Sequence, residues 1–198
     1  MELHRHRTKM KDIFGELSTG GYQVLFLIRD PVSRFRSGFN SRLRMGRPRY
    51  NSPWRPNEKV AFERFKTSDE LASALDAGDA ETRRAAEFAM NSIQHVRNRQ
   101  SEWLVSPEYL EKHRDRIFYI GLQETFEDDV RAILRKLGVD DTLPEMDERT
   151  RHATPAGYDM SLSERAVANL RKWYADDYAI YDWCVRERAA VNGRELGS

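Results

Sequence analysis

Residues 24–39 have the sequence VLFLIRDPVSRFRSGF, which carries the strongest structural signal in the chain. The apolar run 24–28 has the length and composition of a buried strand. Asp30 and Pro31 then predict a helix start, because an acid is a frequent N-cap and proline suits the first helical position. We expect this helix over residues 32–44, with an apolar face that comprises Val32, Phe35, Phe39 and Leu43.

Polar side chains follow the predicted strand and line one side of the predicted helix. Arg29 comes directly after the apolar run, and Ser33, Arg34 and Ser37 lie beside the apolar face. In open α/β sheets, ligands bind at the carboxyl ends of the strands. Guanidinium groups, hydroxyl groups and a helix N-terminus all favour an anion, most commonly a phosphate. The stretch therefore predicts an anion site, and the alternative is a basic surface helix that happens to follow a strand.

The segment RDPVSRFRSGF, residues 29–39, also resembles a known motif. It is similar to the 3′-phosphate-binding motif of sulfotransferases that use 3′-phosphoadenosine 5′-phosphosulfate (PAPS). The closest resemblance is to the Golgi carbohydrate sulfotransferases and their bacterial relatives. In that motif the strand-end arginine and the helix serine hold the 3′-phosphate of the nucleotide. The resemblance therefore implies that Arg29 and Ser37 bind this phosphate.

A second stretch resembles the later part of the same family pattern. Residues 118–124, FYIGLQE, form a predicted strand that ends near a glutamate, and the helix after it carries Asp128 and Asp129. The matching stretches together run from about residue 4 to about residue 183. The resemblance implies an α/β protein with a P-loop-like sulfotransferase fold, in which a central, mostly parallel sheet is flanked by helices.

One part of the family pattern has no counterpart in this chain. The family cradles the 5′-phosphosulfate in a loop after its first strand, with a lysine and small or hydroxyl residues. Residues 19–21, Thr-Gly-Gly, precede a predicted strand, and residues 9–11, Lys-Met-Lys, follow no apolar run. We therefore expect an N-terminally incomplete family member, or else a short protein with a degenerate site.

Sulfuryl transfer removes a proton from the acceptor, so a general base is expected. In several carbohydrate sulfotransferases the base is a histidine just ahead of the 3′-phosphate strand. The resemblance points to His4, with His6 as the alternate, whereas a solvated basic segment is the competing interpretation. A late loop with basic and hydroxyl residues often closes over the nucleotide in this group. That feature implies Arg151 and Thr154 as nucleotide contacts, unless they belong to a simple surface loop.

Other reactive side chains have more ordinary interpretations. His95 either lines the acceptor cleft or is a structural histidine, and Glu58 is the substitute base if the histidines prove dispensable. His113 lies in a charged run and is expected to be solvated. Cys184 lies among apolar residues and is expected to pack in the core. No histidine, cysteine or aspartate cluster has the spacing of metal ligands, so no metal is expected.

The loop Arg42–Arg55, RLRMGRPRYNSPWR, combines arginines with two aromatic residues. Arginines pair with anionic groups and aromatic rings stack on sugar faces, so the loop suits a sulfated or acidic sugar. Alternatively, Tyr50 and Trp54 anchor the loop to the core. The same composition suits contact with RNA, which gives a rival function.

Composition limits the remaining possibilities. The 198 residues are expected to form one domain, 1–198, of the sulfotransferase type. The 33 basic residues nearly balance the 32 acidic ones, which argues against a protein that binds nucleic acids in general. One cysteine excludes an internal disulfide framework. Because no apolar run approaches 18 residues and the N-terminus does not resemble a signal peptide, we expect no membrane segment and a cytoplasmic location.

The rest of the chain is expected to be mainly helical. Helices are expected over 57–65, 68–77, 80–96, 124–137, 161–174 and 176–188, with a short helix from Ser106 and strands at 22–29 and 116–122. The function expected from the resemblance is transfer of sulfate from PAPS to an acceptor, first of all a carbohydrate hydroxyl or another small hydroxyl compound. The alternatives are a non-catalytic remnant that binds a nucleotide or sulfated glycan, and an RNA-binding module.

Overall fold

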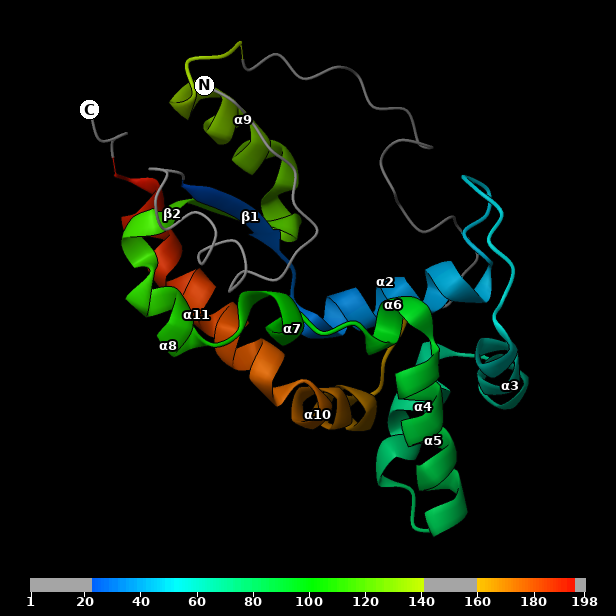
Figure 1. Cartoon of the computed structure of the whole chain (residues 1–198). Helices are drawn as coiled ribbons and strands as arrows, with labels where there is room; N and C mark the ends of the chain where they lie inside the picture. The colour runs from blue at the N-terminus through cyan, green and yellow to red at the C-terminus, as the bar shows by residue number, and fades with distance from the viewer. Residues whose placement is uncertain (1–22, 141–159, 195–198) are drawn as a thin grey trace. The chain divides into compact units, whose positions relative to one another are not determined.

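The computed structural model describes residues 23–140 and 160–194, which group into two compact units (Figure 1). Among these residues, the first unit comprises 23–30, 99–140 and 176–194, and the second comprises 31–98 and 160–175. The units alternate along the chain, so each is assembled from segments that are distant in sequence. A single domain over residues 1–198 stays a prediction.

The first unit is built on a parallel pair of strands, both at the predicted positions. Strand β1 (Val24–Ile28) pairs with β2 (Ile117–Leu122), and Ile28 lies opposite Leu122 at the carboxyl ends. Strands that run in the same direction bring their carboxyl ends to one edge. The described residues therefore form a mixed, largely helical protein with a small parallel sheet, consistent with the predicted α/β class.

Helices cover both faces of this sheet (Figure 1). Helix α9 (Phe126–Lys136) packs on one face against Phe118 and Tyr119. Gly138, the residue after its C-cap Leu137, has a positive φ, as is common where a helix ends. Helix α11 (Ala175–Asn192) packs on the other, together with α7 (Ser101–Leu104) and α8 (Pro107–Lys112). The core on this face comprises Ile28, Leu104, Leu110, Ile117, Ile120, Leu122, Ile180, Trp183, Cys184 and Val191.

Cys184 is confirmed as a core residue. Its side chain is buried, and burial raises the pKa of the thiol to about 12. Each large apolar side chain buried in this core contributes on the order of 1.5–3 kcal/mol to the free energy of folding. Within the described residues, no helix is both long enough and apolar enough to cross a membrane.

The prediction that β1 is a buried strand was only partly correct. Residues Val24–Phe26 are half-buried and Leu27 is 38% exposed, whereas every residue of β2 is buried. Within residues 23–140 and 160–194, β1 has a strand neighbour on one edge only. On β2, the side-chain amide of Asn192 accepts a hydrogen bond from the N–H of Ile120 at 2.8 Å and donates one to its carbonyl at 3.0 Å. A side chain thus extends the hydrogen bonding of this small sheet.

The second unit is a helical assembly around α2 (Pro31–Leu43), which carries the polar half of the central motif. Phe35 and Phe39 are fully buried on α2, as predicted, and Phe39 lies edge-on to Phe62 with ring centroids 5.3 Å apart. Thr67 and Glu70 form a capping box at the start of α4. The other helices of this unit are α3 (Pro56–Arg64), α4 (Ser68–Ser73), α5 (Ala80–Ser92), α6 (Gln94–Arg97) and α10 (Glu164–Trp173), with a 3₁₀ turn at Ala74–Asp76.

The apolar face predicted for α2 was wrong at its C-terminal end. Arg42 is the buried residue there, at 1% exposure, and Leu43 is only half-buried. The Arg42 guanidinium donates two hydrogen bonds to the carboxylate of Glu58, at 2.8 and 2.7 Å. It also donates to the carbonyl groups of Ser52 and Pro53. A buried charge is tolerated here because it is paired with a carboxylate and each of its three nitrogens donates a hydrogen bond.

The same carboxylate explains why the helix predicted over 80–96 is interrupted. Helix α5 ends at Ser92, Ile93 adopts an extended conformation, and α6 begins at Gln94. Glu58 accepts the backbone N–H of Gln94 at 3.0 Å. This acceptor replaces a helical carbonyl for Gln94, so the chain turns at Ile93 without leaving a buried N–H unsatisfied.

We expect Glu58→Gln to lower the free energy of unfolding near pH 7 by about 3 kcal/mol, because it breaks a buried charge pair. Burial raises the pKa of Glu58, but hydrogen bonds from Arg42 and from the backbone of Arg55 and Gln94 lower it to about 2, against an ordinary 4.5. This stabilisation is present above pH 4.5 and is lost as the pH falls toward 2. Urea denaturation at pH 7 and pH 3 should show the gap between wild type and variant shrinking.

Glu63→Gln is the matched control for this prediction. Glu63 lies on the same helix, 61% exposed, in an ion pair with Lys59 at 3.9 Å. Its loss should cost less than about 0.5 kcal/mol at either pH. Equal losses for the two variants would contradict the role assigned to Glu58.

Candidate functional site

The carboxyl ends of β1 and β2 meet, and polar residues follow both strands. Asp30 comes two residues after β1, and Glu124 lies in the 3₁₀ turn Gln123–Thr125 that follows β2. The backbone N–H of Asp30 donates to the Glu124 carboxylate at 3.0 Å. Glu124 thereby ties the chain after one strand to the chain after the other, at the edge where the sequence predicts an anion site.

Arg29 lies at this edge, half-buried, directly after the last residue of β1. Its N–H donates to the side-chain oxygen of Gln100 at 3.1 Å, and its carbonyl accepts from the Gln100 amide nitrogen at 2.9 Å. Asp177, which is fully buried, in turn accepts the backbone N–H of Gln100 at 2.9 Å. The motif in the sequence indicates Arg29 but neither Gln100 nor Asp177, because no local pattern marks either residue.

Asp129 organises the other strand end. It is 2% exposed and accepts hydrogen bonds from the Tyr119 hydroxyl, the Leu122 N–H and the Thr125 hydroxyl, at 2.8, 2.8 and 2.6 Å. Arg188 adds an ion pair at 2.6 Å. Burial alone raises the pKa of Asp129, but these donors outweigh it and lower the pKa below its usual range. The carboxylate therefore stays ionised and holds the turn that carries Glu124.

Tyr119, whose hydroxyl donates to Asp129, has its pKa shifted in the opposite direction. Burial raises the pKa of Tyr119 to about 12, and its hydrogen bond to the Asp129 carboxylate acts in the same direction. Tyr119 is therefore a permanent donor near neutral pH. The network supports the strand end through fixed charges and hydrogen bonds, with no group that changes its protonation near pH 7.

In the second unit, α2 presents the predicted serine and two further arginines. Ser37 is half-buried. Arg34 donates to the carbonyl of His95 at 3.4 Å, and its guanidinium lies 5.6 Å from the centre of the Tyr174 ring. Arg36 donates to the carbonyl of Met160 at 3.1 Å. The first turns of α2 thus hold positive charge within the unit instead of exposing it fully to solvent.

His95 belongs to α6, which packs closely on α2. A Cβ on Gly38 would lie 3.1 Å from the Cβ of His95, so the glycine permits this approach. His95 is half-buried, and burial lowers the pKa of its imidazole, with a further lowering from the Arg42 charge. His95 is therefore neutral near pH 7, and both of its predicted roles stay predictions.

Two expectations about other residues were wrong. Glu58 is unsuited to replace a catalytic base, because its carboxylate is buried against Arg42 with a pKa of about 2. His113 is half-buried, with its ring centroid 4.5 Å from that of Tyr109, whereas the sequence predicted a solvated side chain.

The loop Arg42–Arg55 is partly committed to internal contacts. Trp54 donates to the carbonyl of Arg42 at 2.7 Å and packs against Phe62 with its ring tilted, the ring centroids lying 5.0 Å apart. This supports the interpretation that Trp54 anchors the loop. Tyr50 remains 46% exposed. Contact of this loop with a sugar or with RNA stays a prediction, but the buried Arg42 is not available for it.

His4, His6, Arg151 and Thr154 lie outside the described residues, so their predicted roles stay predictions. Within residues 23–140 and 160–194, no group of three histidine, cysteine, aspartate or glutamate side chains is placed to hold a metal ion.

A family model described as the sulfotransferase family matches residues 3–183, which is most of the chain. Searches among curated proteins and among solved structures gave no match.

Replacing Asp129 tests the network at the end of β2. Asp129→Asn removes the charge opposite Arg188 and one of the acceptors, so we expect the free energy of unfolding to fall by about 2–4 kcal/mol. Asp128→Asn, at the exposed neighbouring position, should change it by less than about 0.5 kcal/mol. Urea denaturation of both variants measures the difference. A similar small effect of both substitutions would show that the network does not stabilise this unit.

Proposed function

Because the chain belongs to the sulfotransferase family, we propose that it transfers a sulfuryl group from PAPS to a hydroxyl acceptor, first of all a carbohydrate. The observation that carries the proposal is the position of Arg29. It follows β1 directly, at the sheet edge where β2 also ends, and it begins the segment that resembles the 3′-phosphate motif. A family match over residues 3–183 supports this interpretation of the motif.

Arg29 and Ser37 are the proposed ligands of the nucleotide 3′-phosphate. A guanidinium group binds phosphate through charge-assisted hydrogen bonds, and a serine hydroxyl donates one further bond. Arg151 and Thr154 are proposed to contact the nucleotide from the later loop. This set recognises the 3′-phosphate, which distinguishes PAPS from nucleotides such as adenosine 5′-monophosphate.

In the proposed reaction, the acceptor oxygen attacks the sulfur of PAPS. A bond forms between that oxygen and sulfur as the bond from sulfur to the 5′-phosphate oxygen breaks, and adenosine 3′,5′-bisphosphate leaves. The proton of the acceptor hydroxyl passes to His4, or to His6 as the alternate. Positive side chains stabilise the negative charge that develops on the bridging oxygen.

The proposal predicts that the chain prefers a nucleotide with a 3′-phosphate. Adenosine 3′,5′-bisphosphate should bind more tightly than adenosine 5′-monophosphate in isothermal titration calorimetry. Arg29→Ala should weaken the bisphosphate at least about tenfold, because one charge-assisted hydrogen bond contributes roughly 1.5–3 kcal/mol. Its effect on the monophosphate should be much smaller.

Arg131→Ala is the control for the loss of a positive charge. Arg131 lies exposed on α9 in the same unit, so its removal should leave both affinities within about twofold. Equal affinity of the wild type for the two nucleotides would contradict the 3′-phosphate site.

The assignment of the base predicts a selective loss of turnover. His4→Ala should reduce the rate of transfer from PAPS by a factor of roughly 10²–10⁴, the usual contribution of general base catalysis. His6→Ala should have a milder effect, and neither should change nucleotide affinity. The wild-type rate should rise with pH through a pKa near about 6.5. Full turnover in His4→Ala, with loss in His6→Ala or His95→Ala, would move the role to that histidine.

A further inference from the structure

We propose that Gln100 is a positioning residue that holds Arg29 in the conformation required to grip the 3′-phosphate, with Asp177 holding Gln100 in turn. This inference rests on the proposed function, because it gives Gln100 a role only if Arg29 binds the nucleotide. Nothing in the motif around Arg29 indicates that a residue 71 positions later is involved.

The side-chain amide of Gln100 contacts the backbone of Arg29 at two points. The ladder between β1 and β2 pairs residues as far as Ile28 and Leu122. One residue later, the side-chain amide of Gln100 accepts from the N–H of Arg29 at 3.1 Å and donates to its carbonyl at 2.9 Å. An amide that bonds both groups of one residue acts as a neighbouring strand would. It therefore restrains the backbone of Arg29 where the strand ends.

Gln100 is itself anchored by Asp177. The buried carboxylate of Asp177 accepts the N–H groups of Gln100 and Ser101, each at 2.9 Å, and the Ser101 hydroxyl at 2.8 Å. Helix α7 begins at Ser101 and has four residues, too few to be stable without tertiary contacts. Asp177 thus fixes the segment from which the Gln100 side chain extends.

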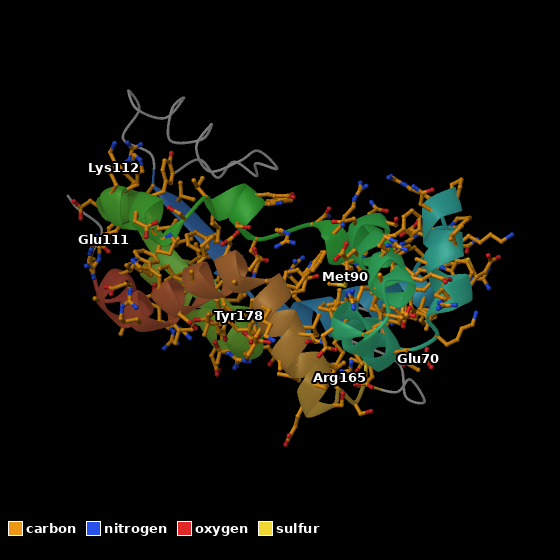
Figure 2. All side chains as sticks on the ribbon, turned by 90° about the horizontal axis from the view of Figure 1, so that it is seen from below. Glu70, Met90, Glu111, Lys112, Arg165 and Tyr178 are labelled. Carbon is orange, nitrogen blue, oxygen red and sulfur yellow. The ribbon has the colours of Figure 1, made fainter. Side chains whose placement is uncertain are left out.

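The same turn of α11 also holds the residue after Arg29. Tyr178, labelled on α11 in Figure 2, donates its hydroxyl to the Asp30 carboxylate at 3.0 Å. Asp177 reaches Arg29 through Gln100, and Tyr178 reaches Asp30 directly. Two consecutive residues of one helix therefore restrain two consecutive residues at the end of β1.

These restraints matter because arginine binds phosphate with a strict geometry. The planar guanidinium forms parallel hydrogen bonds only when its plane faces the phosphate oxygens. The direction in which the long side chain leaves the backbone depends on the backbone angles at Arg29. A displacement of about 1 Å in a positioned group is enough to cost a large factor in function.

The test compares the affinities for adenosine 3′,5′-bisphosphate and adenosine 5′-monophosphate in Gln100→Ala, measured by calorimetry on the whole chain. We expect the bisphosphate to bind about five- to tenfold more weakly and the monophosphate to change less than about twofold. In an Arg29→Ala background, Gln100→Ala should have no further effect on the bisphosphate, because the group that it positions is absent. Gln123→Ala, an exposed glutamine just after β2, is the matched control and should change neither affinity.

A purely structural role gives a different result. Equal weakening of both nucleotides by Gln100→Ala, or a full additional loss in the Arg29→Ala background, would overturn the proposal. Asp177→Asn serves as the second variant if Gln100→Ala does not fold. It retains the shape of Asp177 and should reproduce the selective loss for the bisphosphate.

These measurements also distinguish a failure of the proposed 3′-phosphate site from a failure of the positioning role of Gln100 alone. If the wild type shows no preference for the bisphosphate and Arg29→Ala has no effect, the proposed 3′-phosphate site is wrong and the role of Gln100 is wrong with it. If Arg29→Ala abolishes the preference but neither Gln100→Ala nor Asp177→Asn reduces it, only the positioning role is wrong.

Discussion

The hydrogen bonds between the Gln100 side chain and the backbone of Arg29 set the end of the β1 strand, where the polar residues of the first unit begin. A sheet of two strands has few ladder hydrogen bonds, and both strands need partners for their remaining backbone groups. Side-chain amides supply them here, from Gln100 beyond the end of β1 and from Asn192 beside β2. Buried aspartates then fix the surrounding turns, so the strand ends are held by paired polar groups.

The second unit uses a buried ion pair for a comparable purpose. Glu58 accepts from Arg42 on α2 and from the backbone at the starts of α3 and α6. One carboxylate thus connects three helices that are separate in sequence. Arg42 and Arg29 therefore have different environments: Arg42 is buried in an ion pair at the end of α2, whereas Arg29 follows a strand whose carboxyl end meets that of its neighbour. The environment of each arginine, and not the density of positive charge, distinguishes a structural arginine from the one proposed to bind the nucleotide.

The structural features that were predicted correctly depend on residues close to one another in the sequence. The cap at Ser106 lies three residues before the N–H group that it accepts, and both strands coincide with short apolar runs. Partners distant in sequence escaped prediction. Gln100 and Asp177 lie 77 residues apart, and the carboxylate that accepts the Gln94 N–H where the helix breaks lies 36 residues away. Hydrophobic periodicity also assigned Leu43 to the core where Arg42 is buried, because periodicity cannot register a charge neutralised by a distant partner.

The most direct measurement is a crystal structure of the chain with adenosine 3′,5′-bisphosphate. The account predicts that the guanidinium of Arg29 lies about 3 Å from oxygens of the 3′-phosphate, with the Ser37 hydroxyl on the same phosphate and the Gln100 amide still bonded to the Arg29 backbone. A nucleotide whose 3′-phosphate contacts neither Arg29 nor Ser37, and lies instead against arginines of the 42–55 loop, would contradict it.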